Sequence, residues 1–555
     1  MKMTAAEALI KCLKEQGVDV VFGYPGGNIL PVYDAMCESS DIRHVLVRHE
    51  QGAVHAADGY ARVTGKVGVC MATSGPGATN LVTGIANAYM DSIPMVVITG
   101  QVSTTMVGTD AFQEVDITGI TIPITKHNYL VKDAGKLPLI VKQAFHIAAT
   151  GRPGPVLIDI PKNVLQEEII YEDIDDLKMM GYKPTYRGNK SQINMACDLI
   201  MQAWRPLIYC GGGIHASNAA DILTRLAEMI SAPVTSTLMG LGAIPGSHDL
   251  SLGMLGLHGA KYANLAVTEC DVLIALGVRF DDRVAVDFSS FAPNAKIIHV
   301  DIDPAEIGKN VRVDIPIVGD VRIVMDAMLE RLEEKNCDEW LEQVREWKKA
   351  YPLQYKTETG LKPQAIIEAI RELTNGEAVM VTDVGQHQMW AAQYYRTKLP
   401  RTFVSSGGLG TMGYGLPAAV GAKIGLPDRE VVLVTGDGSF QMCMQEFGTA
   451  VEQGLPIKVI ILNNFSLGMV RQLQEFYCNR RYIATDFQKN PDFVKFAGVY
   501  DAPGLRISDA GQLHSVLEQA LQYDGPVIVD CIIEKEENVY PMVLAGQPLS
   551  QPIEG

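Results

Sequence analysis

The chain has 555 residues, of which 47% are hydrophobic and 20% are charged, and this balance is typical of an ordinary soluble globular protein with several cores. The formal net charge of −17 argues against non-specific nucleic-acid binding, which needs a basic surface, and against adhesion to an anionic membrane. An acidic chain also repels anions at long range, so any anion site must be built locally.

The ten cysteines are scattered singly and form no CxxC pair, so zinc ribbons and thioredoxin-like chemistry are not expected. Free thiols fit a reducing cytosol, which predicts a cytoplasmic location. The first residues, MKMTAAEALIKCLKEQG, indicate an amphipathic helix and not a signal peptide, because they contain no uninterrupted apolar core. The sequence has no apolar run of about 18 residues or more, so no transmembrane span is expected.

Short β-branched runs alternate with helix-like stretches through residues 1–165. The runs VDVVFGYPGG, HVLVRHE, VGVCMATSGPGATN, MVVITG and GPVLIDIP are typical of strands buried on both faces of a parallel sheet. The segments between them, such as AVHAADGYARVTG, have helical spacing. This βαβ pattern predicts a doubly wound α/β domain.

The same pattern occurs twice more. A charged and polar stretch at 166–192 is interpreted as a surface linker, and a second block follows at 190–335. A charged helical stretch at 329–360 leads to a third block at 362–535, and the tail at 536–555 is turn-rich. The sequence therefore predicts three doubly wound, parallel-sheet α/β domains followed by an irregular tail.

The sharpest local signal lies in the third block. The run VVLVTGDGSF places Gly436, Asp437 and Gly438 at the end of an apolar strand, and after 24 further residues Asn463 and Asn464 end a second strand. Carboxylate and amide oxygens suit Mg²⁺ or Ca²⁺. The glycines let the backbone approach a diphosphate, and adjacent strand ends meet at the carboxyl edge of the sheet.

This spacing of GDG and NN resembles the motif of thiamine-diphosphate enzymes, a family built from three such domains. The resemblance implies that Asp437, Asn464 and the backbone carbonyl of Ser466 hold Mg²⁺. It also implies that Met412 wedges the cofactor into a bent shape. A flexible methionine could instead fill a gap in the core, but the setting of Met412 among glycines favours the wedge. The other cofactor contacts that the resemblance implies are Val384, Gly385, Gln386, His387, Gly410, Gly436, Gly438, Ser439, Leu467, Gly468 and Met469.

Glu50 stands in HVLVRHEQGA, where an apolar strand ends and a helix begins. It could simply be a first-turn acid that the helix dipole stabilises. The resemblance instead implies that this carboxylate hydrogen-bonds the pyrimidine ring nitrogen of the cofactor and promotes loss of the proton from thiazolium C2. In the family the first domain of one subunit faces the third domain of another, which implies a homodimer or homotetramer.

Further motifs, spread over nearly the whole chain, are similar to the biosynthetic acetohydroxyacid (acetolactate) synthases of this family: GYPGG, SGPGATN, GTDAFQE, GRPGPVLIDIPK, GVRFDDRV and GMVRQ. The resemblance implies decarboxylation of pyruvate and its ligation to a second 2-ketoacid in valine, leucine and isoleucine biosynthesis, with a possible small regulatory subunit. Arg283 would pair with the carboxylate of the second substrate. The catalytic contacts implied with it are Gly27, Glu50, Phe112, Gln113 and Lys162.

The charge cluster RFDDR follows the apolar run DVLIALG in the second block. It could be a solvated turn, but by resemblance it belongs to an FAD site in the middle domain. The flavin would be structural, because the ligation moves no net electrons. The implied flavin contacts are Arg152, Gly212, Gly213, Thr237, Leu238, Leu255, Gly256, His258, Gly277, Arg279, Asp281, Arg283, Asp301, Ile302 and Asp303.

Two positions depart from the family pattern. Leu473 stands where the family usually has a tryptophan that shapes the acceptor pocket, so a weaker preference for 2-ketobutyrate is expected. Asn28 follows GYPGG, where many members have alanine, and its amide could bind substrate or water near the thiazolium. These departures leave room for a different acceptor.

Three alternatives stay open. A pyruvate oxidase would share both cofactors but use the flavin for electrons, and a carboligase would use another acceptor; a glyoxylate carboligase would lack the activating glutamate, whereas this chain has Glu50. A non-catalytic scaffold is the third, and the presence of Glu50, Asp437 and Asn464 argues against it.

Overall fold

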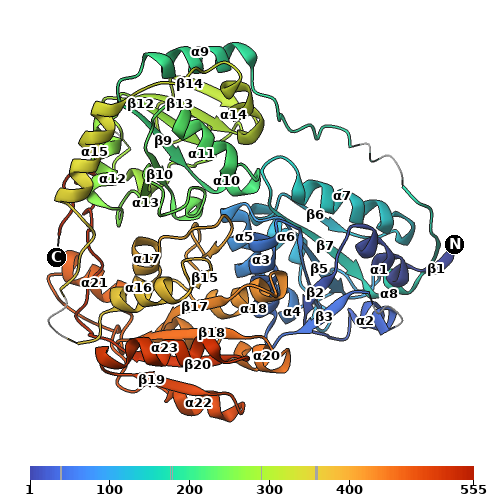
Figure 1. The fold of residues 1–555 in the computed structure, drawn as a ribbon. Coiled ribbons are helices and arrows are strands. Elements are labelled where there is room, and N and C mark those ends of the chain that lie inside the picture. The colour runs from blue at the N-terminus through green and yellow to red at the C-terminus, as the bar shows by residue number, and fades with distance from the viewer. Residues whose placement is uncertain (38–40, 175–176, 178, 289, 357–359, 555) are drawn as a thin grey trace.

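The computed structural model describes residues 1–555 with the exception of 38–40, 175–176, 178, 289, 357–359 and 555. Three six-stranded sheets occupy separate parts of the molecule, with the middle domain (green) above the first (blue) and the third (orange to red) beside it (Figure 1). Every strand pair within these sheets is parallel. The predicted fold class, three doubly wound α/β domains, is confirmed.

In the first sheet the strands follow the spatial order β3 (Arg43–Leu46), β2 (Val20–Gly23), β4 (Gly68–Ala72), β5 (Met95–Gln101), β7 (Pro155–Pro161) and β6 (His127–Leu130). One face packs on α1 (Ala5–Glu15), α2 (Leu30–Cys37) and α7 (Leu137–Ala149). The other face packs on α3 (Glu50–Thr64) and α5 (Val82–Asp91). Strands β4, β5 and β7 are buried along their whole length, which explains their continuous apolar sequence.

The N-terminal segment differs from the expected uninterrupted helix. Strand β1 (Lys2–Thr4) pairs antiparallel with β8 (Glu168–Ile170), which lies in the stretch interpreted as a linker. Helix α1 begins only at Ala5, because the side chain of Thr4 accepts a hydrogen bond from the backbone N–H of Glu7 and the Glu7 carboxylate accepts one from the backbone N–H of Thr4. The start of the chain is thus tied to the end of the first domain.

The middle sheet has the order β11 (Ser251–Met254), β10 (Val234–Ser236), β9 (Pro206–Cys210), β12 (Val272–Leu276), β13 (Lys296–Asp301) and β14 (Ile315–Val318). Helices α9 (Lys190–Gln202), α11 (Ala220–Met229) and α14 (Val321–Leu329) cover one face. Helices α12 (Lys261–Glu269) and α15 (Asp338–Ala350) cover the other. The charged stretch at 329–360 therefore contributes one long helix, α15, to this domain.

The third sheet has the order β16 (Phe403–Val404), β15 (Val379–Thr382), β17 (Val431–Gly436), β18 (Ile457–Asn463), β20 (Val527–Ile532) and β19 (Gly504–Ile507). Helices α16 (Pro363–Leu373), α17 (Gln386–Tyr394) and α23 (Leu513–Gln522) cover one face. The other face packs on α18 (Gly415–Gly425), α20 (Glu446–Glu452) and α22 (Phe493–Val499). The remaining α-helices are α4 (Pro76–Thr79), α6 (Ile117–Thr121), α8 (Lys162–Gln166), α10 (Gly212–Ala216), α13 (Asp282–Ala285), α19 (Asp437–Phe440) and α21 (Gly468–Tyr477).

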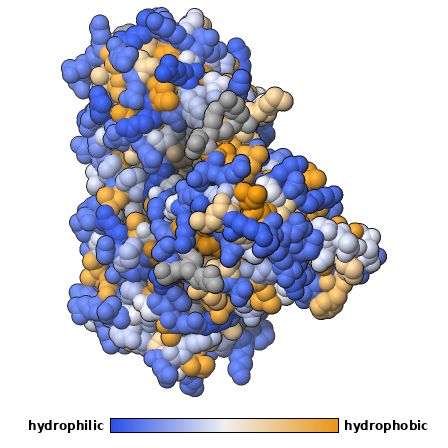
Figure 2. Space-filling model, turned by 90° about the vertical axis from the view of Figure 1, so that its right-hand side faces the viewer, coloured by the Kyte–Doolittle hydropathy of each residue, from blue (hydrophilic) through white to orange (hydrophobic). Residues whose placement is uncertain are grey.

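Within the described ranges of the chain, the structure contains no helix of the length and apolar character that a membrane crossing requires. The face drawn in Figure 2 is mostly hydrophilic, and its hydrophobic residues form small patches separated by hydrophilic ones. Small exposed apolar patches of this kind are normal on a folded protein.

The first and third domains share one hydrophobic core, in which α3 lies against α18 (Figure 1). The contact is close because both helices present glycine. A Cβ on Gly59 would overlap the backbone carbonyl of Ala418, and a Cβ on Gly421 would overlap that of Ala56. Two glycines thus set the distance between the two helices.

We expect Gly421→Ala to lower the free energy of unfolding by about 1–3 kcal/mol, because the added methyl group must push the two helices apart. Urea and thermal unfolding would measure the change. Gly498→Ala is the matched control, since Gly498 lies exposed on α22 and its Cβ would meet open space. Equal stability of the two variants would contradict the close packing of α3 on α18.

Candidate functional site

A cavity of about 50 Å³ lies at the carboxyl ends of β15, β17 and β18 in the third domain. Of the residues that the sequence suggested for thiamine diphosphate and metal, every one except Gly410 lines this cavity. Those lining residues are Val384, Gly385, Gln386, His387, Met412, Gly436, Asp437, Gly438, Ser439, Asn464, Ser466, Leu467, Gly468 and Met469. The carboxyl edge of the sheet brings them together although the first and the last of them, Val384 and Met469, lie 85 positions apart in the chain.

Asp437 is the first residue of α19 and is almost fully buried. Its Oδ2 accepts a hydrogen bond from Asn490 Nδ2 at 2.6 Å, whereas its Oδ1 is buried without a hydrogen-bond partner among the described residues. Burial raises the pKa of Asp437 to about 6. A cation at Oδ1 would satisfy this oxygen and favour the charged carboxylate.

Asn464 follows β18, and its Oδ1 accepts a hydrogen bond from the backbone N–H of Ser466 at 3.0 Å. Both residues are buried at the cavity, as Asp437 is. One carboxylate, one amide oxygen and the carbonyl of Ser466 form a donor set of hard oxygens, which is the kind that Mg²⁺ prefers. The residues present therefore fit the metal.

Close packing shapes the wall of the cavity. A Cβ on Gly468 would overlap Gln386 Oε1, so this glycine lets α21 approach α17.

The wall also contains unpaired polar atoms. Gln386 Oε1, His387 Nε2 and Trp390 Nε1 are buried without hydrogen-bond partners among the described residues. Burial lowers the pKa of His387 to about 3, so its ring is neutral at neutral pH. Unpaired polar atoms at the wall fit a polar ligand.

Glu50 is the first residue of α3, four positions after the end of β3 at Leu46. Its Oε2 accepts a hydrogen bond from Asn80 Nδ2 at 3.0 Å. Glu50 does not line the cavity that contains Asp437 in the same chain. Gly27, Phe112, Gln113 and Lys162 do not line it either, so the chain holds two separate groups of suggested catalytic residues.

The group in the first domain gathers where the strands of the first sheet end. Gly27 follows β2, and Lys162 begins α8 directly after β7. Asn28 donates a hydrogen bond from Nδ2 to Ser74 Oγ at 2.7 Å, so its amide is held against the loop after β4. Phe112 is 87% exposed, so within one chain its side chain faces solvent and is not packed against the other residues of this group.

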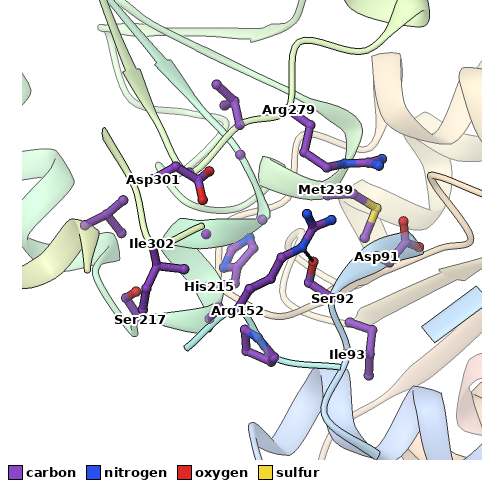
Figure 3. Close-up of a pocket in the computed structure, with 18 of the residues that line it drawn as sticks. Asp91, Ser92, Ile93, Arg152, His215, Ser217, Met239, Arg279, Asp301 and Ile302 are labelled. Atoms are coloured by element: carbon purple, nitrogen blue, oxygen red, sulfur yellow. Dashed lines mark hydrogen bonds between the residues drawn. The ribbon is translucent and has the colours of Figure 1, made fainter. Parts of the chain in front are cut away.

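A second cavity, of about 360 Å³, lies mainly between the first and middle domains (Figure 3). Nine of the residues suggested for FAD line it: Arg152, Gly212, Gly213, Thr237, Gly277, Arg279, Asp281, Asp301 and Ile302. Leu238, Leu255, Gly256, His258, Arg283 and Asp303 do not line it. The Arg283 side chain is 71% exposed on α13, and Asp303 instead accepts a hydrogen bond from Arg152 Nη1 at 3.1 Å.

The walls of this cavity fit a dinucleotide at the carboxyl edge of the sheet. A Cβ on Gly213 would lie 2.6 Å from Gly277 Cα, so glycines allow the turns after β9 and β12 to touch. Figure 3 shows Arg152 at the centre, where its Nε donates a hydrogen bond to Ser92 Oγ at 2.8 Å. The polar atoms His215 Nδ1, Thr237 Oγ1 and Glu306 Oε2 have no hydrogen-bond partner among the described residues.

Sequence reasoning missed the ion network that lines this second cavity from the first domain. Arg62 donates hydrogen bonds to Asp58 Oδ1 at 2.5 Å and to Asp91 Oδ2 at 2.8 Å, and all three side chains are buried. No recognised motif marked Arg62 or Asp91. The only available signal was the presence of charged residues in otherwise apolar helical segments, which points to burial with a partner.

Asp91 also holds the loop that leads to Met412. Its carboxylate accepts hydrogen bonds from the backbone N–H groups of Gly407 at 3.0 Å and Gly408 at 2.7 Å. Asp91 lines the larger cavity, whereas Met412 lines the smaller one. Residues 407–412 therefore lead from a carboxylate on the wall of the larger cavity to a side chain on the wall of the smaller one.

We expect Asp91→Asn to lower the free energy of unfolding by about 3 kcal/mol, because Arg62 loses one of its two buried partners. The variant should also bind thiamine diphosphate less tightly, since the 407–412 loop loses its anchor. Thermal unfolding and cofactor titration would measure both effects. Asp34→Asn on the exposed side of α2 is the control, and equal behaviour of both variants would contradict the anchoring role.

Comparison with known proteins gives consistent matches along the chain. The N-terminal TPP binding domain of thiamine pyrophosphate enzymes matches residues 3–120, their central domain matches 193–328, and their C-terminal TPP binding domain matches 383–531. Thiamine pyrophosphate, abbreviated TPP, is another name for thiamine diphosphate. All three matches lie in the order in which the three sheets occur.

Full-length relatives agree with these matches. An acetolactate synthase large subunit from Mycobacterium tuberculosis is 51% identical over 98% of this chain and 90% of its own length. One from Parasynechococcus marenigrum is 51% identical over 99% of this chain and 90% of its own length. An acetolactate synthase from Arthrospira platensis is 52% identical over 98% of this chain and 96% of its own length.

Proposed function

Because this chain belongs to the thiamine pyrophosphate enzyme family and, within it, to the acetolactate synthases, we propose that it joins two 2-ketoacids with loss of CO₂. Two pyruvate molecules give 2-acetolactate and CO₂, and pyruvate with 2-ketobutyrate gives 2-aceto-2-hydroxybutyrate and CO₂. The observation that carries the proposal is the buried Asp437 Oδ1, which has no hydrogen-bond partner among the described residues and lies at the end of the strand next to the one that Asn464 follows.

Asp437, Asn464 and the carbonyl of Ser466 would hold Mg²⁺, and the glycines around them would leave room for the diphosphate. When bound, thiamine diphosphate supplies an electron sink for decarboxylation. The Glu50 carboxylate would hold a proton at the pyrimidine ring nitrogen. Arg283 would pair with the carboxylate of the second substrate, and Gly27, Phe112, Gln113 and Lys162 would surround the substrates.

The proposed site needs a second copy of the chain. Glu50 does not line the cavity that contains Asp437, so the first domain of one copy would have to face the third domain of another. A homodimer is the smallest assembly that meets this need, and a homotetramer would contain it twice. The name "large subunit" of the relatives supports a small regulatory partner for this chain as well.

FAD would occupy the larger cavity, where Arg152 and Arg279 offer cations and Asp301 offers a hydrogen-bond acceptor. The flavin would hold the domains together without carrying electrons, because the ligation has no redox step. The domains would span 1–165, 190–335 and 362–535, with the tail at 536–555. We also propose a cytoplasmic role in branched-chain amino-acid biosynthesis, which the relatives' names as acetolactate synthases support.

The decisive experiment is an assay of the purified protein with pyruvate, thiamine diphosphate, Mg²⁺ and FAD. Acetolactate would be scored as acetoin after acid treatment, while an electrode follows dissolved oxygen. Acetoin without stoichiometric oxygen uptake is the expected result. Oxygen uptake without acetoin would identify an oxidase, and turnover only with another 2-ketoacid or an aldehyde would identify a different carboligase; either result would overturn the proposal.

We expect a weak preference for 2-ketobutyrate over pyruvate as the acceptor, because Leu473 on α21 is smaller than the tryptophan usual in the family. Leu473→Trp should raise the preference roughly tenfold, the size of effect that one apolar contact has on substrate choice. The ratio of the two products in mixed-substrate assays would measure it. Val499→Trp on exposed α22 is the control. Strong 2-ketobutyrate preference in the unaltered protein would contradict the prediction.

A further inference from the structure

A third cavity, of about 110 Å³, lies between the middle and third domains. Its walls come from β10, β11 and α12 of the middle domain, from α15, and from the end of α17 in the third domain. It shares no lining residue with either of the cavities described above. It is therefore distinct from the proposed thiamine and flavin sites.

Two cationic side chains line this cavity. Lys348 on α15 donates a hydrogen bond from Nζ to the backbone carbonyl of Ser251 at 3.1 Å, and Ser251 is itself part of the wall. Arg396 follows the end of α17 and is exposed to solvent. In the part of the chain that the structure describes, neither side chain forms an ion pair with a carboxylate. Two neighbouring cations without anionic partners are unexpected in a chain with a net charge of −17.

The electrostatic environment of Lys348 supports this reading. Burial and the like charge of Arg396 lower the pKa of Lys348, and the opposing charge of Asp249 does not offset them. Asp249 is exposed and does not line the cavity. A bound anion would stabilise the charged form of Lys348 and offset the repulsion between the two cations.

Two further polar groups complete the cavity. Gln393 is 6% exposed, and its Nε2 donates hydrogen bonds to the backbone carbonyls of His258 at 2.9 Å and Tyr540 at 3.2 Å. This orientation leaves Oε1 buried without a hydrogen-bond partner among the described residues, so it needs a donor. Burial raises the pKa of Tyr262, which therefore keeps its hydroxyl proton at neutral pH and can donate a hydrogen bond.

Water alone does not account for this arrangement. A cavity of about 110 Å³ has room for water that could donate to Gln393 Oε1. Solvent can reach the exposed Arg396, but neutral water in the cavity would leave the half-buried charge of Lys348 without a compensating anion. The cavity thus offers two cations, one hydroxyl donor and one acceptor to the same small ligand.

We propose that this cavity binds a small oxyanion that also carries a hydroxyl group, for which hydrogen phosphate and a 2-hydroxycarboxylate are the simplest examples. Lys348, Arg396 and Tyr262 bind the anionic oxygens, and the ligand's hydroxyl donates to Gln393 Oε1. The ligand links α15 of the middle domain to the end of α17 in the third domain, so its binding stabilises the contact between these domains. The proposal is independent of the catalytic function proposed above.

The test measures the unfolding temperature of the full-length protein loaded with thiamine diphosphate, Mg²⁺ and FAD. Inorganic phosphate is titrated against sodium chloride at equal ionic strength, because loading keeps phosphate from the diphosphate site. We expect a saturable rise in unfolding temperature. Lys348→Gln and Arg396→Gln should weaken the apparent affinity roughly tenfold each, whereas Lys349→Gln, a neighbouring exposed lysine on α15, should leave it within about twofold.

Two further ligands identify the chemistry. Lactate should compete if the natural ligand is a hydroxycarboxylate, and a response to phosphate alone would assign the site to phosphate. Sulfate has no proton to donate to Gln393 at neutral pH and should bind more weakly than phosphate. The proposal is overturned if phosphate raises the unfolding temperature no more than chloride does, or if sulfate binds as tightly as phosphate. It is also overturned if Lys349→Gln lowers the apparent affinity for phosphate as much as Lys348→Gln does.

Discussion

Asp437→Asn should reduce acetolactate formation at least about a hundredfold, even at saturating Mg²⁺. The amide keeps the size of the side chain and can still contact Asn490, but it removes the only carboxylate among the three proposed metal ligands. The affinity for thiamine diphosphate should fall with the affinity for the metal, because the residues that would hold the metal and those that would hold the diphosphate line the same cavity. Fluorescence of Trp390, which lines the same cavity, would follow the cofactor titration.

Asp501→Asn is the matched control, because Asp501 is an exposed carboxylate in the same domain. Circular dichroism would establish that both variants are folded. Unchanged Mg²⁺ dependence in Asp437→Asn would remove the main support for the metal site and, with it, for the proposed function.

Glu50→Gln should lower the turnover number about 10²- to 10⁴-fold, the range that loss of a positioned acid or base produces. The affinity for thiamine diphosphate should change much less, since Glu50 lies outside the group of residues around Asp437. Hydrogen–deuterium exchange at thiazolium C2 of the added cofactor would measure the proton step directly. Glu168→Gln, which alters an exposed carboxylate paired with Lys2, serves as the control.

A mixture of the two inactive variants tests where the site is assembled. If Glu50 of one copy meets Asp437 of another, random dimers of Glu50→Gln and Asp437→Asn chains place both defects in one site and none in the other. About a quarter of the wild-type sites should then be intact. If the mixture stays inactive while mixed dimers demonstrably form, both residues serve the same chain and the proposed two-chain site is wrong.

The Asp91 contacts connect the proposed flavin and thiamine sites physically. Arg62, Asp91 and Met239 lie on the wall of the larger cavity, and the 407–412 loop passes from Asp91 to Met412 on the wall of the smaller one. A ligand that orders one side of this wall would favour the ordered form of the other side. This coupling offers a physical reason for a flavin that carries no electrons.

Local sequence patterns were sufficient to identify the three α/β domains and the residues around Asp437 and Asn464. Strands buried on both faces of a parallel sheet must be apolar along their length, so they can be recognised without the structure. The two polar residues each follow such a strand, and neighbouring parallel strands end at the same edge. The pairing of β1 with β8 was missed, because two strands of three residues carry too little periodicity to be recognised.

The sequence by itself therefore determined the fold class and the position of Asp437 and Asn464 at two strand ends, since both follow from patterns repeated along one element or at its end. Only the tertiary structure decided that Asp91 holds the 407–412 loop and that Lys348 and Arg396 share a cavity. These relations arise from packing between domains. Packing of this kind depends on the shapes of whole helices and sheets, and no spacing along the chain encodes it.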